Sequence, residues 1–326
     1  MTESERAAAA ERLREKELER AHLLRAQGRP YVQPEKITSL LDFDPKKGGL
    51  YYNRYAFVDL QTFDLDEESP FGPMSCTYAI KDADLCGAVN ILSVKIASSD
   101  VGFPIHVYGT VIVRDSLDER CVYHFRRSSD HCQLINSEAE SLILTGPKRG
   151  LALLGDIYVE IDLKIKDHLG QHRELSKGIF IIRGLAGRSL TGSMVETKSL
   201  ATRLRMVDVT YSVIKHALEG TIAFEVLQGG FHGKITVCTS SIEDELVLYD
   251  SKDADALTVD DCGKIQLMRP VVSVNVTDLL MIVARTSDGI SERIVFTPRV
   301  NRGEDDILAV GATKKHVKVF CSAMDP

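Results

Sequence analysis

Hydrophobic and polar residues alternate with a period of two along most of the chain from about residue 89. The clearest example is DIYVEIDLKIKD at 156–167, where the two kinds of side chain project from opposite faces of an extended chain. Its hydrophobic face holds Ile157, Val159, Ile161, Leu163 and Ile165, and its polar face holds Tyr158, Glu160, Asp162, Lys164 and Lys166. Strict alternation predicts an antiparallel strand with one face in water. We therefore expect Ile161 to lie deep in a core and Asp162 to face solvent.

Similar segments follow one another through the body of the chain, separated by clusters of Gly, Asp and Ser rather than by helical patterns. They lie at 89–96, 105–114, 120–126, 179–183, 204–214, 221–227, 233–239, 245–249, 271–276, 279–285, 290–297 and 316–321. Short alternating strands without intervening helices favour an antiparallel β-sandwich over a parallel α/β sheet. The pattern thus predicts a mainly β, sandwich-like body over 87–326.

Two hairpin-like stretches in this body resemble each other. VYGTVIVRDSLDERCVYHFRRS at 107–128 and FHGKITVCTSSIEDELVLYDS at 231–251 both consist of a strand, an acidic turn and a second strand. Gly109 corresponds to Gly233 in this comparison. The similarity predicts two quasi-repeated lobes, 87–190 and 198–326. The alternative is a chance likeness between two ordinary hairpins.

The N-terminal region, 1–30, has a different composition from the body. It is rich in Ala, Leu, Glu and Arg, which favour helix, and Thr2 and Glu5 have the spacing of a capping box. We expect a charged helix over 3–27 that ends near Gly28. Its polar character on nearly every side is typical of a solvated extension, and the alternative is a helix that docks on a partner.

Residues 31–86 are expected to form an arm or linker with short β pieces, laid against the body. Prolines interrupt this stretch at Pro34, Pro45, Pro70 and Pro73. The segment LYYNRYAFVDL at 50–60 has the β-branched and aromatic residues of a short strand.

Composition narrows the function classes. The chain has 326 residues, a net charge of -7 and a pI near 5.8, which argues against binding to nucleic acid or to anionic membranes. No apolar stretch is long enough for a membrane span, and the start lacks a signal-peptide core. The seven cysteines are odd in number and scattered, as is typical of reduced thiols. We expect a cytoplasmic or nuclear protein.

The region 121–132 concentrates residues that resemble a metal site. A zinc site would need Cys121, His124, His131 and Cys132 to converge on one centre. Because side chains alternate along a strand, Cys121 is expected to be buried and His124 exposed, so the two diverge. We interpret the stretch as an ordinary hairpin surface, with Arg126, Arg127 and Asp130 at its solvated end.

Other chemical motifs are weak. Glu160 and Asp162 share a polar strand face, where a catalytic acid and base is the alternative to solvated side chains. The acidic loop Asp250, Asp253, Asp255, Asp260 and Asp261 has oxygen ligands suited to calcium but lacks the EF-hand spacing. TGPKRG at 145–150 is not a phosphate loop, and Cys238 near Ser240 and Ser241 is expected to be a structural thiol. The linear sequence therefore assigns no catalytic, cofactor-binding or metal-ligating residue.

Several long segments carry a resemblance to a known family. They are TFDLDEESPFGPM (62–74), NILSVKIASSDVGFPIHVYGTVIVRDSLD (90–118), CQLI (132–135), LILTGPKRGLAL (142–153) and IYVEIDLKIKD (157–167). In this order they resemble a grass-specific plant family catalogued only as a domain of unknown function, from about residue 50 to the C-terminus. The resemblance implies a β-rich, intracellular protein and brings no catalytic residues, although some members are fused to ribosome-inactivating domains.

That fusion raises the alternative of an rRNA N-glycosidase, whose E-x-x-R pair lies on a buried helix near a tryptophan. Glu17 with Arg20 and Glu3 with Arg6 have the spacing, yet both pairs lie in the charged terminal helix and the chain has no Trp. The toxin domain itself is not recognisable here.

We therefore expect a non-enzymatic β-rich interaction or regulatory protein with an unidentified protein partner, acting in plant stress or defence. One alternative is a hydrolase whose site is assembled from residues distant in sequence. The other is a carbohydrate or calcium-dependent lipid binder that uses the loops at one end of the sandwich. A deep polar pocket with two titratable groups would favour the enzyme, and a broad apolar patch would favour the interaction protein.

Overall fold

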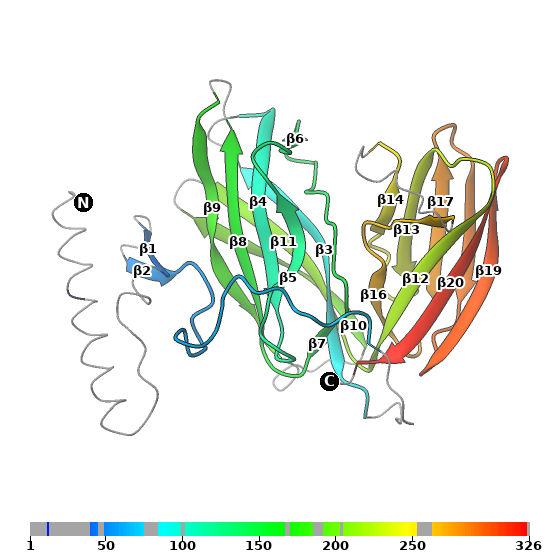
Figure 1. Cartoon of the computed structure of the whole chain (residues 1–326), viewed down its shortest axis with the longest axis horizontal. Coiled ribbons are helices and arrows are strands. Elements are labelled where there is room, and N and C mark those ends of the chain that lie inside the picture. Colours follow the sequence, from blue (N-terminus) through cyan, green and yellow to red (C-terminus); the bar gives the residue numbers. More distant parts are fainter. Residues whose placement is uncertain are drawn as a thin grey trace.

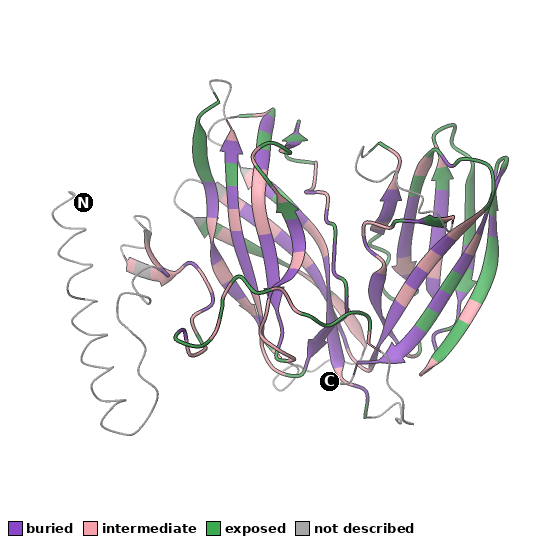
Figure 2. Ribbon diagram, in the orientation of Figure 1, coloured by how far each residue is buried: buried purple, intermediate pink, exposed green. Residues whose placement is uncertain are grey.

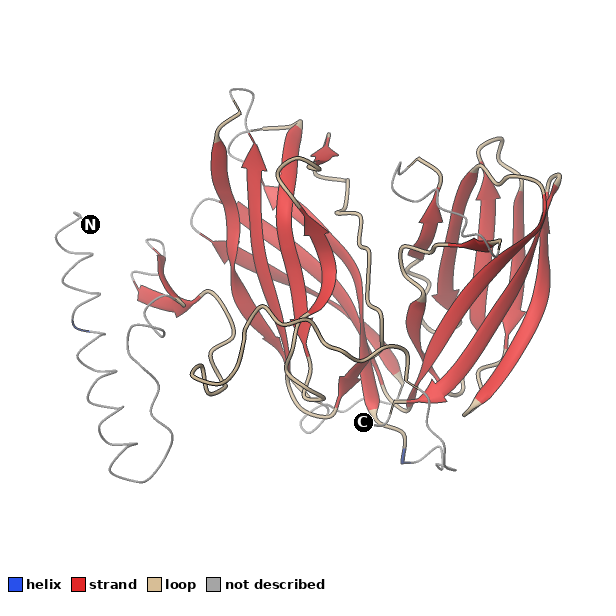
Figure 3. Ribbon diagram, in the orientation of Figure 1, coloured by secondary structure: helices blue, strands red, loops and turns tan. Residues whose placement is uncertain are grey.

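The computed structural model describes most of the body and parts of the arm. The described residues are 40–44, 49–74, 84–98, 102–166, 170–184, 192–202, 205–252 and 263–324, together with Arg12. Apart from Arg12, the helix expected over 3–27 lies outside them. Across the described part, Figure 3 shows strands joined by loops, which confirms the mainly β prediction.

The strands are all paired antiparallel within their sheets, as the alternation of hydrophobic and polar positions predicts. Their bounds are β1 Leu41–Asp44, β2 Gly49–Tyr52, β3 Gly87–Ser98, β4 Ile105–Arg114, β5 Val122–Arg127, β6 Gln133–Ile135, β7 Leu151–Leu153, β8 Ile157–Lys166, β9 His172–Ile182, β10 Ser193–Thr202, β11 Arg205–Ile214, β12 Ala217–Gln228, β13 Gly233–Thr239, β14 Leu246–Asp250, β15 Lys264–Ile265, β16 Val271–Asn275, β17 Leu280–Thr286, β18 Ser291–Phe296, β19 Arg302–Val310 and β20 Thr313–Ala323.

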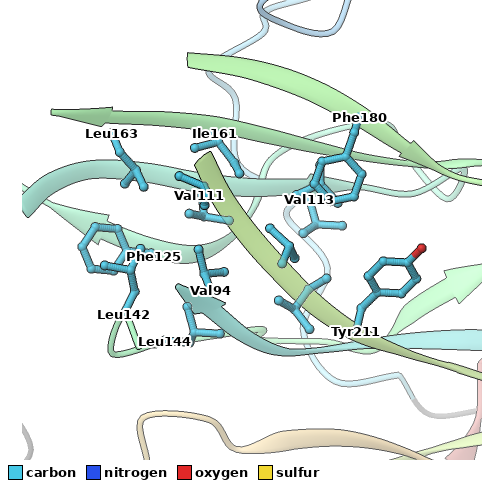
Figure 4. Packing of buried hydrophobic residues seen from close by; sticks show 14 of the residues in the cluster. Val94, Val111, Val113, Phe125, Leu142, Leu144, Ile161, Leu163, Phe180 and Tyr211 are labelled. Carbon is cyan, nitrogen blue, oxygen red and sulfur yellow. The ribbon is translucent and has the colours of Figure 1, made fainter. Parts of the chain in front are cut away.

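The first lobe is a sandwich of two sheets. One has the strand order β10-β11-β3-β7, and the other has the order β5-β4-β8-β9 with β6 paired to β4. Hydrophobic side chains of the two sheets meet between them, and Figure 4 shows Val111 and Ile161 on one side and Val94 on the other. Ile161 is 1% exposed, so the expectation that it lies deep in the core is confirmed.

The second lobe repeats this architecture. Its sheets have the orders β19-β20-β12, with β15 and β16 on the far edge of β12, and β14-β13-β17-β18. Strands β12, β13, β14, β17 and β20 thus take the places of β3, β4, β5, β8 and β11. The lobe has its own hydrophobic core. Figure 1 shows the two sandwiches side by side, and Figure 2 shows buried residues running through both. The prediction of two quasi-repeated lobes is confirmed.

The similarity between the two hairpins has a structural cause. Gly109 has φ +120° and Gly233 has φ +154°, which are backbone conformations that residues other than glycine rarely adopt. A Cβ atom at Gly109 would lie 2.1 Å from the carbonyl O of Asp162, and one at Gly233 would lie 2.1 Å from that of Arg285. Both glycines therefore allow the same close approach to the neighbouring strand.

The border between the lobes differs from the expected one. Strand β11 pairs with β3 along its whole length, and β10 pairs with β11, so the first lobe extends to Ile214 instead of ending near residue 190. The second lobe begins with β12 rather than at residue 198. A local pattern shows that a strand forms but not which neighbour it takes, because the partner of β11 lies more than a hundred residues earlier.

The longest described part of the arm, 49–74, runs across the first lobe towards the second (Figure 1). The Ser69 N–H of the arm donates a hydrogen bond to the carbonyl O of Cys121. The Leu65 carbonyl O of the arm accepts a hydrogen bond from the guanidinium of Arg114. Its Met74 N–H reaches Glu219 of β12. Among the described residues, no helix has the length and the apolar character needed to cross a membrane.

Candidate functional site: the cleft between the lobes

A cleft of about 870 Å³ lies between the two lobes. Strands β3 and β6 and the segment 136–144 line it from the first lobe, and β13, β14 and the segment 268–269 line it from the second. In their sheets β6 pairs only with β4, and β14 only with β13, so both are edge strands (Figure 1). One backbone carbonyl of β14, that of Leu248, accepts a hydrogen bond from the Met268 N–H. Such edges are natural templates for an additional extended chain.

The walls of the cleft combine apolar and charged side chains. Leu134 of β6 is 45% exposed, and Val247 of β14 and Met268 are half-buried. Lys234 and Lys252 are exposed at the second lobe's side. A concave surface of this kind offers apolar contact together with a few polar groups that fix orientation.

Arg269 is the most unusual residue of the cleft. It comes from the second lobe and is 3% exposed, and its Nη2 donates a 2.6 Å hydrogen bond to the carbonyl O of Ile91 in the first lobe. Its Nε has no hydrogen-bond partner, and no described carboxylate forms an ion pair with it. Burial without a counter-charge lowers the pKa of Arg269 to about 10. The site therefore holds a desolvated positive charge with unused donors.

His124 is buried, and the expectation that it is exposed was wrong. Phe125 pairs with Val111 and Tyr123 pairs with Ile112, which leaves His124 as the extra residue of a β-bulge. The bulge interrupts the alternation of faces, so Phe125 lies in the hydrophobic core and His124 is buried as well. Neither ring nitrogen has a hydrogen-bond partner. Burial, and secondly the charge of Arg269, lowers the pKa of His124 well below 6.5.

Buried polar contacts hold the two lobes together. The Asn90 side chain exchanges hydrogen bonds with the backbone of Ser273, at 2.8 Å and 2.9 Å. Glu219 of β12 accepts hydrogen bonds from the N–H of Gly150 in the first lobe, at 2.5 Å, and of Met74 in the arm, at 2.7 Å. Burial raises the pKa of Glu219. These contacts give the cleft walls a defined relative position.

The sequence suggested that the polar face of β8 is solvated, and for Glu160 this expectation was wrong. Glu160 is 4% exposed, and its Oε1 lies 2.7 Å from Nε of Arg114, which is fully buried. The Tyr55 N–H of the arm donates to the same oxygen at 2.9 Å. Asp162 keeps 36% of its side chain exposed and lies 3.8 Å from Lys164. The arm thus covers Glu160, and its ion pair with Arg114 makes it unsuited to acid–base chemistry.

TGPKRG contributes a second buried ion pair. The Arg149 guanidinium donates to both carboxylate oxygens of Asp115, at 2.6 Å and 2.9 Å, and both side chains are almost fully buried. The Ala152 N–H donates to Asp115 as well. This bidentate pair joins the end of β4 to β7, which is a structural role.

The residues considered for zinc do not converge. The Cys121 thiol donates to the carbonyl O of Leu65 and the Cys132 thiol to that of Ser129, while His131 is exposed beside Ser128. In the described chain, no three residues of the type His, Cys, Asp or Glu are grouped so as to hold a metal ion.

Of the acidic loop considered for calcium, Asp250 lines the cleft, and Asp253, Asp255, Asp260 and Asp261 lie outside the described residues. Ser240 and Ser241 both donate to the carboxylate of Asp278. Cys238 is half-buried, and burial raises the pKa of its thiol. The pairs Glu17–Arg20 and Glu3–Arg6 also lie outside the described residues.

Sequence reasoning missed Arg269 completely. The signal lay in the repeat: Thr145 N–H donates to the carbonyl O of His124, and Met268 N–H donates to that of Leu248. The segments TGP (145–147) and MRP (268–270) are therefore equivalent, and Arg269 stands where the first lobe has Gly146. At this pair of equivalent positions, only the second lobe has a charged side chain, and that side chain is buried.

This geometry defines a tandem β-sandwich protein with a cleft between its lobes. The chain belongs to the family described as domain of unknown function DUF6598, whose model matches residues 88–319. No curated protein matches it.

Among solved structures, human GIVD cytosolic phospholipase A2 is similar at 8% identity and a TM-score of 0.25, covering 74% of this chain and 31% of that chain. The same enzyme in complex with methyl gamma-linolenyl fluorophosphonate gives 8% identity and a TM-score of 0.22, covering 74% and 33%. This chain thus spans about a third of the enzyme's length. A likeness of this size carries no argument about function.

Proposed function

We propose that this protein is a non-enzymatic interaction protein that receives an extended segment of a partner protein in the cleft between its lobes. The observation that carries the proposal is the cleft of about 870 Å³ lined by two edge strands, β6 and β14. An extended segment laid between them gains main-chain hydrogen bonds from an edge and side-chain contacts from the walls, which is a common mode of peptide recognition.

The ion pairs of the buried acids support a binding role rather than a catalytic one. Glu160 is neutralised by Arg114 and Asp115 by Arg149. A carboxylate held in a tight ion pair is a poor general acid or base, because proton transfer has to break the pair first.

The setting of the proposal comes from the sequence resemblance. We propose an intracellular protein of grasses, in the cytosol or nucleus, that acts in stress or defence. Its partner would be a protein, since the net charge of -7 disfavours nucleic acid.

Site-specific photo-crosslinking tests the proposal. A benzophenone side chain placed at Leu134, inside the cleft, should capture a protein in grass leaf extract. The control is the same group at Ile307, which is 53% exposed and does not line the cleft. Filling the cleft by Val247→Trp should abolish the product formed from Leu134. Equal capture from both positions, or capture from Leu134 that persists with the cleft filled, would refute the proposal.

A further inference from the structure

We propose that Arg269 anchors an acidic group, a carboxylate or a phosphate, of the segment held in the cleft. This inference rests on the proposed function and specifies the chemistry of the partner. Arg269 donates one N–H of its guanidinium to the Ile91 carbonyl, and a guanidinium has five such donors.

An arginine in this state needs a counter-charge. Removing a cation from water costs several kcal/mol unless an anion and hydrogen bonds compensate for it. Arg114 and Arg149, which are buried to a similar degree, both have a carboxylate at 2.6–2.7 Å. Arg269 has none among the described residues. The contrast among the three buried arginines indicates that the missing anion comes from outside.

The neighbourhood of Arg269 favours an anion over a neutral group. His124 beside it is uncharged, and Lys234 and Lys252 add positive charge at the same cleft. The acids that line the cleft already have hydrogen-bond donors within the chain: Glu245 is bound to Arg285 at 2.6 Å and 2.8 Å, Glu140 accepts from the Asn136 N–H, and Asp250 accepts from the Lys252 N–H. The apolar side chains of Leu92, Val247 and Met268 flank the position. We therefore infer an acidic residue with apolar neighbours on the partner segment.

Matched capped peptides test this inference on the full chain. The probes are acetyl-Leu-Glu-Leu-amide, its Gln counterpart and its phosphoserine counterpart, titrated while the amide resonances of Ile91 and Met268 are followed by NMR. The Glu or the phosphoserine peptide should bind about tenfold or more tightly than the Gln peptide, since hydrogen bonds to charged groups are worth about 1.5–3 kcal/mol. The tighter of the two acidic peptides identifies the source of the anion.

Variants assign the preference to Arg269. In Arg269→Gln, the acidic and Gln peptides should bind with nearly equal affinity, and Arg269→Lys should keep part of the preference. Lys252→Gln removes an exposed charge from the same cleft and should leave the preference within about threefold, as an exposed, screened charge contributes little. Urea denaturation of each variant verifies that it is folded.

Equal binding of the Glu, phosphoserine and Gln peptides to the wild-type protein would overturn the inference without depending on any variant. So would an unchanged preference in folded Arg269→Gln. If the Leu134 crosslink persists in either case, partner binding in the cleft stands and only the anionic anchor fails. If no peptide shifts the cleft resonances and Leu134 captures nothing, both proposals fail.

Discussion

At the scale of single residues, the structure contains several buried charges and polar groups. Their hydrogen-bond and ion-pair partners determine whether each one stabilises or destabilises the fold. The Arg114–Glu160 pair has its partners within the chain, whereas His124 has none for either ring nitrogen. A buried polar group costs free energy unless it is paired, so these two cases predict opposite responses to substitution.

Replacing Glu160 by Gln should lower the free energy of unfolding by about 3–5 kcal/mol, because it leaves the guanidinium of Arg114 buried without its counter-charge. Urea denaturation measures the change. The matched control is Glu245→Gln, which breaks an exposed pair with Arg285 and should cost about 1 kcal/mol or less. Equal losses would mean that Glu160 is not shielded by the arm.

Replacing His124 by Leu should raise the free energy of unfolding by about 1–3 kcal/mol, because two unpaired ring nitrogens leave the interior. The equivalent residue of the second lobe is Leu248, which lies in its core. An unchanged or lower stability of the variant would show that the imidazole has partners.

The same substitution should change the dependence of stability on pH. The folded pKa of His124 is depressed, so below about pH 6.5 the unfolded chain takes up a proton that the folded chain does not. The wild-type protein should therefore lose stability relative to His124→Leu as pH falls, by up to about 1.4 kcal/mol per pH unit. Urea denaturation of both proteins at about pH 7.5 and about pH 5.5 measures this difference, and parallel curves would contradict it.

At the scale of elements, the two lobes repeat their irregularities as well as their strand order. The register of β4 with β5 shifts between Val111 and Ile112, and the register of β13 with β14 shifts between Ile235 and Thr236. Gly109 and Gly233 precede these bulges by two residues. A bulge bends and twists the strand that carries it, so the equivalent bulges bend both sandwiches in the same way.

Gly109→Ala and Gly233→Ala should each lower the free energy of unfolding by about 2–4 kcal/mol, since the new methyl group would strain φ and strike a backbone carbonyl. Gly72→Ala is the control, because nothing lies within 4 Å of its Cβ position, and it should stay within about 0.5 kcal/mol. Thermal or urea denaturation compares the three. A mild effect at one glycine alone would argue against equivalence of the hairpins.

At the scale of the whole molecule, a few buried polar contacts join the arm and both lobes. Glu219 is central among them, because one carboxylate accepts hydrogen bonds from Met74 of the arm and Gly150 of the first lobe while its own strand belongs to the second. The position of the cleft walls depends on this junction.

Glu219→Ala should lower the free energy of unfolding by about 2–5 kcal/mol, because two N–H groups lose their acceptor. Hydrogen exchange should accelerate at Met74 and Gly150 together. The control on the same strand is Glu225→Ala, which removes a solvent-screened pair with Lys318. Its loss of stability should be much smaller than that of Glu219→Ala, and hydrogen exchange at Gly150 should stay unchanged. Acceleration at only one of the two amides would show that Glu219 does not couple the arm to the lobe.

The sequence by itself determined most of the strands, the antiparallel class of the sheets and the repeat, while β10 and β19 lay outside the segments that the alternation predicted. Period-two alternation depends only on the geometry of an extended chain, so Ile161 could be placed in the core before any partner strand was known. The glycines of the two hairpins marked equivalent positions, because a close backbone approach excludes a side chain wherever it occurs.

Only the tertiary structure decided which polar residues are buried and what the lobes enclose. The alternation predicts that Glu160 is exposed, because the arm that covers it lies about a hundred residues earlier in the sequence. His124 reads as exposed because a bulge needs a partner strand to be recognised. The guanidinium of Arg269 is bound by the carbonyl O of Ile91, which lies in the other lobe and far away in the sequence. Burial and electrostatics depend on neighbours that are distant in sequence, which no local pattern of hydrophobic and polar residues contains.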